Sequence, residues 1–437
     1  MSCSMQNSKG NIVPHRLLPQ SSLSRKSGKL TYRSVLLAII GAALLLPALL
    51  ASGSIRTAST KPAGRGPCAS IQAFAGSQKD AGPAFRGCLE QTPAGGTIAL
   101  PPGQYLIATP VRITRPVILR TKDSGDAAPP CFADEKRCAV LHFSVSPDGV
   151  AGAVMPFDIN SSNVRLDRLI FEGARLSDPA LTARLCSSDK ERPLAGGLRI
   201  NGNDNSITRS IFRNMGCYTA LEYGGGENVV ISNNLFSSNG THNIQSRWAD
   251  GLTIHSGNGF QVTDNRFHDN TDVQLIFGGC INCTVKNNRF SHSARAGGGS
   301  FAELMLQAWP KATSGDYTGT RVTGNRIDCG AERRCGFGIM IGSAPWYDAP
   351  AYGGSVTDNV VRGAMLALNV DKLTGPMVIE RNNLNSSSGT YPSMCGPHSL
   401  QGVMANISPA SRPFLSQYPT DGISLAHYCI LNFKIGP

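Results

Sequence analysis

The chain has 437 residues, of which 41% are hydrophobic and only 16% are charged. Its 48 glycines and small number of Asp and Glu residues (29) are unfavourable for long helices, which excludes coiled coils and helical bundles. The formal net charge of +12 suggests nucleic-acid binding only if that charge lies on the folded part of the chain.

Much of the positive charge lies in a short N-terminal segment. Residues 1–60 contain seven basic and no acidic residues, which leaves 34 basic and 29 acidic residues, a net charge of +5, on the remainder. A basic leader at 1–34 precedes an uncharged apolar run at 35–51, and a linker follows at 52–66. Basic residues before an apolar segment hold that flank in the cytoplasm.

Two interpretations of the run at 35–51 remain open. An uncleaved transmembrane anchor is favoured by the long leader, and a cleaved signal sequence by the short apolar core. In both cases the rest of the chain is exported, to the periplasm or the cell exterior. Nucleic acid is therefore not an expected partner, whereas the membrane is one through residues 35–51.

The cysteines fit an exported protein. Twelve of the 13 lie after the apolar run, where disulfides persist. Cys280 and Cys283 have the CxxC spacing, for which a local disulfide competes with a metal or redox site. The other predicted pairs are Cys131–Cys138, Cys329–Cys335, Cys68–Cys88, Cys186–Cys217 and Cys395–Cys429.

A six-residue pattern recurs along the chain: an apolar residue, two variable residues, usually Asn, a variable residue and a second apolar residue. It begins at Leu166, Ile207, Ile231, Val262, Val285, Val322, Val356 and Ile379. The fourth position is Asn in the last six copies, and successive copies lie 23 to 41 residues apart. A period of 23 or 24 with loop insertions explains these spacings. We expect the asparagines to support a tight turn, where Asn tolerates the left-handed conformation, and to hydrogen-bond from coil to coil.

Each repeat also contains an earlier strand in which apolar and polar residues alternate. These strands lie at 197–201, 220–224, 251–255, 272–276, 303–307 and 338–342. Alternation with period two indicates that one face is buried. Two or three short strands per turn predict an all-β solenoid, a right-handed parallel β-helix, over 67–385, with a C-terminal covering segment at 386–437.

The segment from Gly95 to Ile107, GGTIALPPGQYLI, resembles the opening strand of the pectin-lyase-like β-helix superfamily, which often reads GGT-x-x-LPPG-x-Y. The resemblance covers about residues 67–385 and implies an N-terminal cap helix near Asp80 to Leu89. It also implies a lyase, hydrolase, epimerase or adhesin, because the fold hosts all of these. Asn270-Thr-Asp272 spells the N-T-D motif of polygalacturonases, in which that Asp is catalytic, but the G-H-G and R-I-K motifs of that family are missing.

Aligning the inward residues of the early strands predicts a functional face. The alignment uses Leu198, Leu221, Leu252, Val273, Leu304 and Ile339, and it places equivalent outward residues ~4.8 Å apart on neighbouring coils. Asp272 and Glu303 then fall on adjacent coils, with His255 and Asp250 nearby, and these four are the candidate catalytic residues. The candidate substrate-binding residues are Arg199, Glu222, Arg247, Trp248, Gln274, Gln307 and Trp309.

Two carboxylates one coil apart can act as general acid and base, or as acid and nucleophile, in glycoside hydrolysis. A uronate lyase would instead need a base such as Arg247 or His255. No cofactor is expected, although Asp250, Asp272, Glu303 and Glu222 could supply the carboxylates of a calcium site.

We therefore predict an exported enzyme that cleaves glycosidic bonds of a polysaccharide, with hydrolysis favoured over lyase chemistry. The net charge of +5 beyond residue 60 favours an acidic polysaccharide. The alternative is a non-catalytic polysaccharide-binding or assembly protein of the cell envelope. An adhesin is disfavoured because the coils are irregular and carry many loops.

Overall fold

The computed structural model describes residues 68–386, 390–391 and 398–399, apart from 123–124, 126, 149, 151–154, 243, 245, 296, 333, 343–348, 365 and 371–372. The apolar run at 35–51, the pair Cys395–Cys429 and most of the segment 386–437 lie outside these residues. Within the described part of the chain, no helix is long and apolar enough to cross a membrane.

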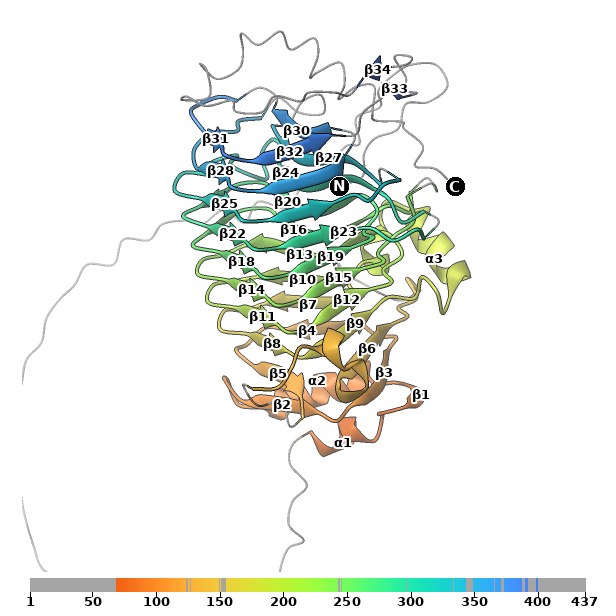
Figure 1. Ribbon diagram of the computed structural model, residues 1–437. Coiled ribbons are helices and arrows are strands. Elements are labelled where there is room, and N and C mark those ends of the chain that lie inside the picture. Colours follow the sequence, from red (N-terminus) through yellow and green to blue (C-terminus); the bar gives the residue numbers. More distant parts are fainter. Residues whose placement is uncertain are drawn as a thin grey trace, which may run out of the picture. The chain divides into compact units, whose positions relative to one another are not determined.

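Three parallel sheets form the walls of a solenoid, and successive coils add one strand to each wall (Figure 1). Sheet A contains β1 (Ser77–Asp80), β3 (Gly103–Ile107), β6 (Ala139–Phe143), β9 (Leu169–Glu172), β12 (Ile211–Arg213), β15 (Leu235–Ser237), β19 (Arg266–His268), β23 (Arg289–Ser291), β26 (Arg326–Asp328), β29 (Val360–Ala364) and β32 (Asn383–Ser386). Sheet B contains β2 (Thr97–Leu100), β5 (Ile118–Thr121), β8 (Arg165–Asp167), β11 (Ser206–Thr208), β14 (Val230–Ser232), β18 (Gln261–Thr263), β22 (Thr284–Lys286), β25 (Arg321–Thr323), β28 (Ser355–Thr357) and β31 (Val378–Glu380). Sheet C contains β4 (Val111–Ile113), β7 (Phe157–Asn160), β10 (Leu198–Asn201), β13 (Tyr218–Gly225), β16 (Ala249–Ile254), β20 (Val273–Phe277), β24 (Ser300–Leu306), β27 (Cys335–Ile341) and β30 (Leu366–Val370).

The remaining elements are short. The small strands are β17 (Gly257–Asn258), β21 (Cys280–Ile281), β33 (Thr390–Tyr391) and β34 (His398–Ser399), and the helices are α1 (Ala69–Gln72), α2 (Gly82–Gln91), α3 (Pro179–Cys186), η1 (Cys131–Ala133), η2 (Glu135–Arg137) and η3 (Arg192–Ala195). Helix α2 lies where the sequence predicts a short helix and buries Phe85, Cys88 and Leu89. The Phe85 ring packs edge-on against Tyr105 and Phe157, so α2 belongs to the same core as the first coils.

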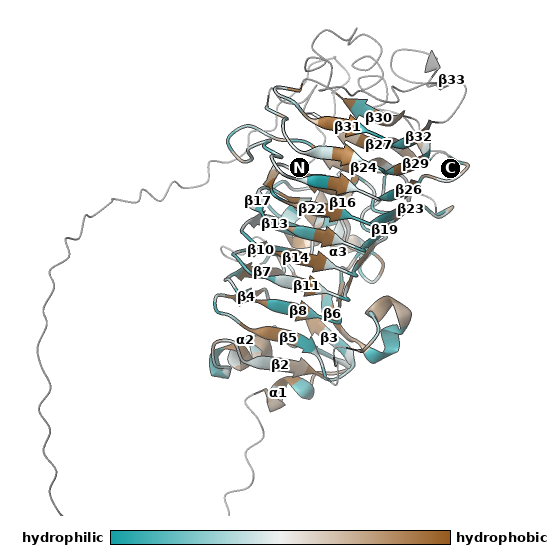
Figure 2. Cartoon of the chain, turned by 60° about the vertical axis from the view of Figure 1, so that its left-hand side comes forward, coloured by the Kyte–Doolittle hydropathy of each residue, from teal (hydrophilic) through white to brown (hydrophobic). Residues whose placement is uncertain are grey.

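The core runs the length of the stack because equivalent apolar residues lie on top of one another. Apolar and polar residues share the same strands (Figure 2), and the apolar ones point inward. Five phenylalanines of sheet A form one continuous stack, with ring centroids 4.8–4.9 Å apart: Phe171, Phe212, Phe236, Phe267 and Phe290. This spacing is that of neighbouring strands, so the rings fix the register of the coils.

The recurring asparagines form the predicted hydrogen-bonded ladder. Within it, the side-chain amide of one Asn donates to the side-chain oxygen of the Asn on the next coil at 2.9–3.1 Å, from Asn234 through to Asn382. The left-handed residue is the one before each Asn, for example Asn233, Asp264 and Asn287, each with φ near +57° or +58°. The expectation that the ladder asparagines themselves adopt this conformation was therefore wrong; their side chains are needed for the hydrogen bonds.

We expect Asn288→Ala to destabilise the protein by about 1–3 kcal/mol. The Asn288 side chain is buried, accepts from the Asn265 backbone and side chain, and donates to Val262 O and to Asn325. Alanine would leave these partners unsatisfied in the core. Urea unfolding checks the prediction, and Asn258→Ala is the matched control for loss of one Asn, because Asn258 is exposed and does not have a positive φ. A cost for Asn288→Ala no larger than for the control would contradict it.

Five disulfides are present among the described residues: Cys68–Cys88, Cys131–Cys138, Cys186–Cys217, Cys280–Cys283 and Cys329–Cys335. All five pairings match the predictions, and Cys280–Cys283 is the local disulfide rather than a metal site. Disulfides at this density are typical of an oxidising, extracytoplasmic environment.

Candidate functional site

The register of sheet C decides which predicted site residues come together. Strand pairing aligns Leu198, Leu221, Leu252, Leu275 and Leu304. The predicted alignment used Val273 in place of Leu275 and was therefore wrong by two residues on this strand. The correction removes Asp272 from the ladder position of Glu303 and puts Gln274 there.

Asp250 and Asp272 are brought together at the start of two neighbouring strands. The Asp272 N–H donates to Ala249 O at 3.1 Å, and the Val273 N–H donates to Asp250 Oδ1 at 3.1 Å. The Thr253 hydroxyl donates to Asp250 Oδ2 at 2.9 Å. Two carboxyl groups therefore lie side by side, one coil apart, and both residues are almost fully buried.

This environment raises the pKa values of the two carboxyl groups by different amounts. Burial raises the pKa of Asp250 to about 6, and burial together with the nearby Asp250 raises the pKa of Asp272 to about 8. Loss of hydration disfavours both charged forms, and two adjacent negative charges repel. Asp272, whose pKa is raised further, is therefore the member of the pair that holds a proton more readily.

A second group of predicted residues continues from this pair along the outer face of sheet C. Arg199 Nη2 donates to Glu222 Oε2 at 2.6 Å, and His255 Nε2 lies 2.7 Å from Glu222 Oε1. Burial alone would raise the pKa of Glu222, but His255 and Arg199 lower it to about 2, so Glu222 is held as an anion. Arg199 Nη2 also lies 3.1 Å from the hydroxyl oxygen of Tyr218.

Tyr218 links the two groups. Burial and then Glu222 raise its pKa, and Asp250 contributes in the same direction. The Tyr218 hydroxyl thus stays neutral beside Glu222, and the charge of Asp250 also acts on it. We refer to Asp250, Asp272, Tyr218, Glu222 and His255 as the outer site.

The two predicted tryptophans each pack against a histidine ring, and Trp309 is buried. The Trp309 ring packs edge-on against the His255 ring at 5.0 Å between centroids, and Gln307 is buried two residues before Trp309. Trp248 precedes β16 and stacks on the His242 ring at 4.7 Å. The half-buried Arg247 side chain makes no hydrogen bond or ion pair with any other described residue.

Arg192, which sequence reasoning missed, brings a positive charge to the outer site. It lies in η3, within the insertion between β9 and β10 that the disulfide Cys186–Cys217 ties to the start of β13. Its Nη2 donates to Trp248 O at 3.4 Å, while its Nε is buried with no partner among the described residues. The guanidinium lowers the pKa of both Asp250 and Asp272.

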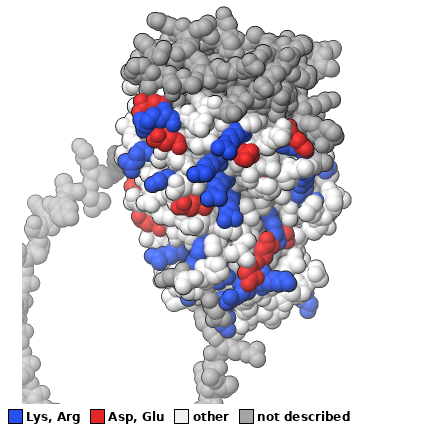
Figure 3. All heavy atoms as spheres, in the orientation of Figure 1, with Lys and Arg blue, Asp and Glu red and all other residues white. Residues whose placement is uncertain are grey.

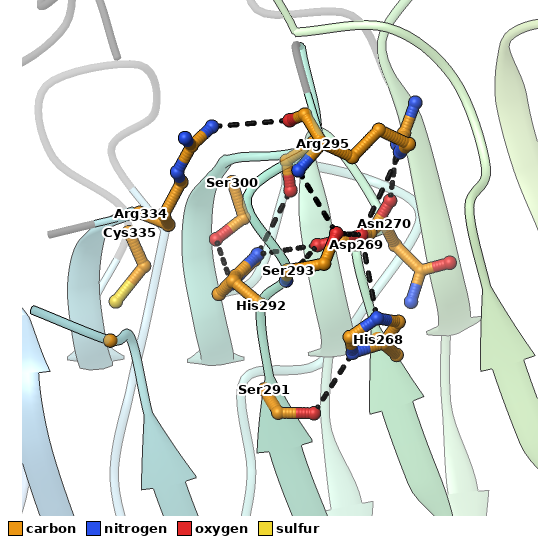
Figure 4. Close-up of polar contacts among 12 residues, drawn as sticks. His268, Asp269, Asn270, Ser291, His292, Ser293, Arg295, Ser300, Arg334 and Cys335 are labelled. Atoms are coloured by element: carbon orange, nitrogen blue, oxygen red, sulfur yellow. Dashed lines mark hydrogen bonds and ion pairs between the residues drawn. The ribbon is translucent and has the colours of Figure 1, made fainter. Parts of the chain in front are cut away.

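Two predicted residues, Glu303 and Gln274, are buried instead of exposed. Gln274 Nε2 donates to Glu303 Oε2 at 2.6 Å, and His292 Nε2 lies 2.7 Å from Glu303 Oε1. Neither side chain is exposed, and His292, which follows β23, contacts both of them. Together with Asn270, Ser300 and Asp269 these residues form a buried corner cluster, part of which Figure 4 shows around His292 and Asp269.

The corner cluster holds a charged histidine. Burial alone would lower the pKa of His292, but Glu303 and Asp269 outweigh burial and raise the pKa to about 10. Asp269 also accepts hydrogen bonds from the backbone N–H and the hydroxyl of Ser293. Its pKa, which burial alone would raise, falls to about 2 because His292 and Ser293 favour the anion. We therefore assign this cluster to stability and leave Glu303 out of the proposed catalytic pair.

The four carboxylates considered for calcium do not share one set of contacts. Glu222 is held by Arg199 and His255, Glu303 by Gln274 and His292, and only Asp250 and Asp272 are adjacent. Glu303 also lies within 4.8 Å of the Cys329 and Cys335 sulfurs, but these are joined in a disulfide and are not thiolate ligands. The described residues thus do not fit the proposed calcium set.

Comparison with known proteins identifies the fold. Residues 196–390 match the model of the family described as "Right handed beta helix region". The chain has the right-handed parallel β-helix fold. No curated protein matches this sequence.

The solved structures to which the chain is similar include the following three. The endo-xylogalacturonan hydrolase from Aspergillus tubingensis has a TM-score of 0.50 and 16% identity, over 71% of this chain and 82% of that chain. The alginate lyase from Paenibacillus sp. str. FPU-7 has a TM-score of 0.47 and 11% identity, over 70% and 96% of the two chains. PfbA, a surface adhesin of Streptococcus pneumoniae, has a TM-score of 0.38 and 13% identity, over 76% and 94%. Because a fold does not determine a function, the function must be argued from the outer site.

Proposed function

We propose that this protein is an exported hydrolase that cleaves glycosidic bonds of a polysaccharide at the outer site. The observation that carries the proposal is the adjacent Asp250 and Asp272, whose raised pKa values differ. A pair of carboxyl groups with separated proton affinities is the usual machinery of glycoside hydrolysis. The endo-xylogalacturonan hydrolase, which has the same fold, also acts on a polysaccharide.

Asp272 is the general acid in this proposal. Its protonated carboxyl donates a proton to the oxygen of the leaving sugar as the glycosidic bond breaks. Asp250 is ionised and either removes a proton from the attacking water or attacks the sugar carbon itself. Tyr218 and Arg192 stabilise the charge on Asp250 and around it. Trp248, which is partly exposed and stacks one face on His242, offers its other face to a sugar ring.

Hydrolysis is favoured over lyase chemistry by the state of His255. A lyase base must be free to remove a proton from carbon, whereas His255 Nε2 is engaged with Glu222 at 2.7 Å. The acid of the pair also suits protonation of a leaving oxygen. An exported location, with residues 35–51 as anchor or signal, is part of the proposal and is supported by the five disulfides.

A product assay tests the proposed function. The full chain is incubated with acidic and neutral polysaccharides, while reducing ends and the absorbance of unsaturated uronates are followed. New reducing ends without unsaturated products are expected. Unsaturated products would indicate a lyase, and binding without either product would indicate a non-catalytic polysaccharide-binding protein.

The pH dependence of kcat/KM should be bell-shaped. Activity requires ionised Asp250 and protonated Asp272, so it should rise with pH through about 6 and fall through about 8. Because Arg192 lowers both pKa values, Arg192→Gln should move both limbs to higher pH, by about 0.5–1 unit. Initial rates between pH 4 and 10 check this.

The matched control for that measurement is Arg184→Gln. Arg184 lies on α3 in the same insertion, but it is exposed and pairs with Asp148 rather than facing the outer site. Its replacement should leave both limbs in place. Unmoved limbs in Arg192→Gln, or equal shifts in the two variants, would contradict the assignment of Arg192.

A further inference from the structure

Three arginines stand in one row on the outer face of sheet A. Strand pairing aligns Arg266 of β19 with Arg289 of β23 and Arg289 with Arg326 of β26. All three side chains are exposed, and Figure 3 shows basic side chains gathered in a column over this face. Neighbouring members lie one strand spacing apart, ~4.8 Å at the backbone. We call Arg266, Arg289 and Arg326 the arginine row.

No carboxylate of the described residues forms an ion pair with the arginine row. Earlier in the same sheet, by contrast, Arg213 is paired with both Glu135 and Glu172. A second row lies beside the arginine row, two residues later on the same strands, and consists of His268, Ser291 and Asp328. The Asp328 carboxylate accepts a hydrogen bond from the Gly330 N–H. The one aromatic contact is Arg266 over the Phe132 ring at 4.3 Å.

Such a row disfavours folding when nothing neutralises it. Like charges directly opposite one another on neighbouring strands repel, and here the central guanidinium has a like charge on each side. Arginine presents a planar fork of donors that binds carboxylate or sulfate groups with two hydrogen bonds. A ligand that carries one anionic group for each arginine would remove the repulsion and use all three forks.

We propose that the arginine row is a binding site for a linear anionic polysaccharide, separate from the outer site. The equal spacing along the stack suits a polymer with a charge on successive units, whereas a compact anion would contact only one or two of the arginines. The row lies on sheet A and the outer site on sheet C, so binding at the row does not require cleavage. A polymer held there would raise the local concentration of its other segments around the protein.

The test measures binding of the full chain to polygalacturonate, using protein that also carries Asp272→Asn to suppress the proposed cleavage. Arg289→Glu should weaken binding about tenfold at low salt, with the effect shrinking as salt screens the charges. Dextran, a neutral polymer, should not bind at the row.

Arg321→Glu is the matched control. Arg321 is an exposed arginine on sheet B whose strand neighbours are Thr284 and Ser355, so the variant makes the same change in net charge without touching the row. It should alter affinity less than twofold, by about 0.4 kcal/mol or less. Equal losses of affinity in Arg289→Glu and Arg321→Glu would show that only the net charge of the protein matters, which would overturn the proposal. Tighter binding of wild-type protein to duplex DNA or to phosphatidylglycerol vesicles than to polygalacturonate would also overturn it.

Discussion

Replacement of Asp272 by Asn should lower kcat on the polysaccharide by about 10²–10⁴-fold while the protein stays folded. The amide is nearly the same size as the protonated carboxyl but cannot give a proton to the leaving sugar. Removing one carboxyl also relieves the repulsion on Asp250, so stability should not fall. Initial rates of reducing-end formation measure the loss, and thermal unfolding measures the stability.

Substrates with different leaving groups distinguish a general acid from a residue that only supports the structure. An aryl glycoside with an acidic phenol as leaving group needs no protonation, so Asp272→Asn should retain much of its activity on such a substrate. Asp250→Asn should lose activity on both substrates. Asp264→Asn is the control, because Asp264 sits at a left-handed turn position that is already Asn in the coils of Asn233 and Asn287. Full activity of Asp272→Asn on the polysaccharide would remove Asp272 from the catalytic pair.

Replacement of Glu303 by Ala should lower the free energy of unfolding by about 3–5 kcal/mol. Glu303 is fully buried and pairs with His292, whose side chain is also inaccessible. Its removal leaves a charged imidazole in the core with only Asp269 as a negative partner, and it leaves the Gln274 amide without its acceptor. Urea unfolding of the full chain measures the effect, and Glu90→Ala, on an exposed helical residue, should change stability by less than about 0.5 kcal/mol.

The contribution of this cluster should also depend on pH. The pKa of His292 rises from an ordinary value of about 6.5 to about 10 on folding, so the imidazolium contributes fully below pH 6.5. That contribution is lost as the pH rises towards 10. The stability difference between wild type and Glu303→Ala should therefore be largest near pH 6 and smaller near pH 10. A difference below 1 kcal/mol at pH 6 would rule out the buried ion pair.

The sequence predicts the architecture well because the signals are local and repeated. The period-two alternation, the recurring asparagine and the short cysteine spacings each describe contacts within one coil or between adjacent coils. The one error of register has a physical cause. Val273, Leu275 and Phe277 all fit the inward face, so a shift of two residues keeps every side chain on the correct side.

The site was harder to predict because its contacts are not local. Glutamate is typical of protein surfaces, and only the contacts of Glu303 with Gln274 and His292 account for its burial. Arg192 comes from an insertion outside the repeat, and only the disulfide Cys186–Cys217 and the fold bring it to Asp250. The outward-facing residues of the strands predicted which face of the solenoid carries the site. Only the structure showed that Asp250, and not Glu303, is the partner of Asp272.

The stacked rings and asparagine ladder have a consequence for engineering. They hold each coil against its neighbours even though successive asparagines are separated by as few as 23 and as many as 37 residues. The way the coils stack therefore does not depend on the length of the segments that connect them. The loops that join the coils near Asp250 and Asp272 could therefore be exchanged between related chains. Such an exchange would change the sugar specificity, while the stacked phenylalanines and the asparagine ladder would preserve the fold.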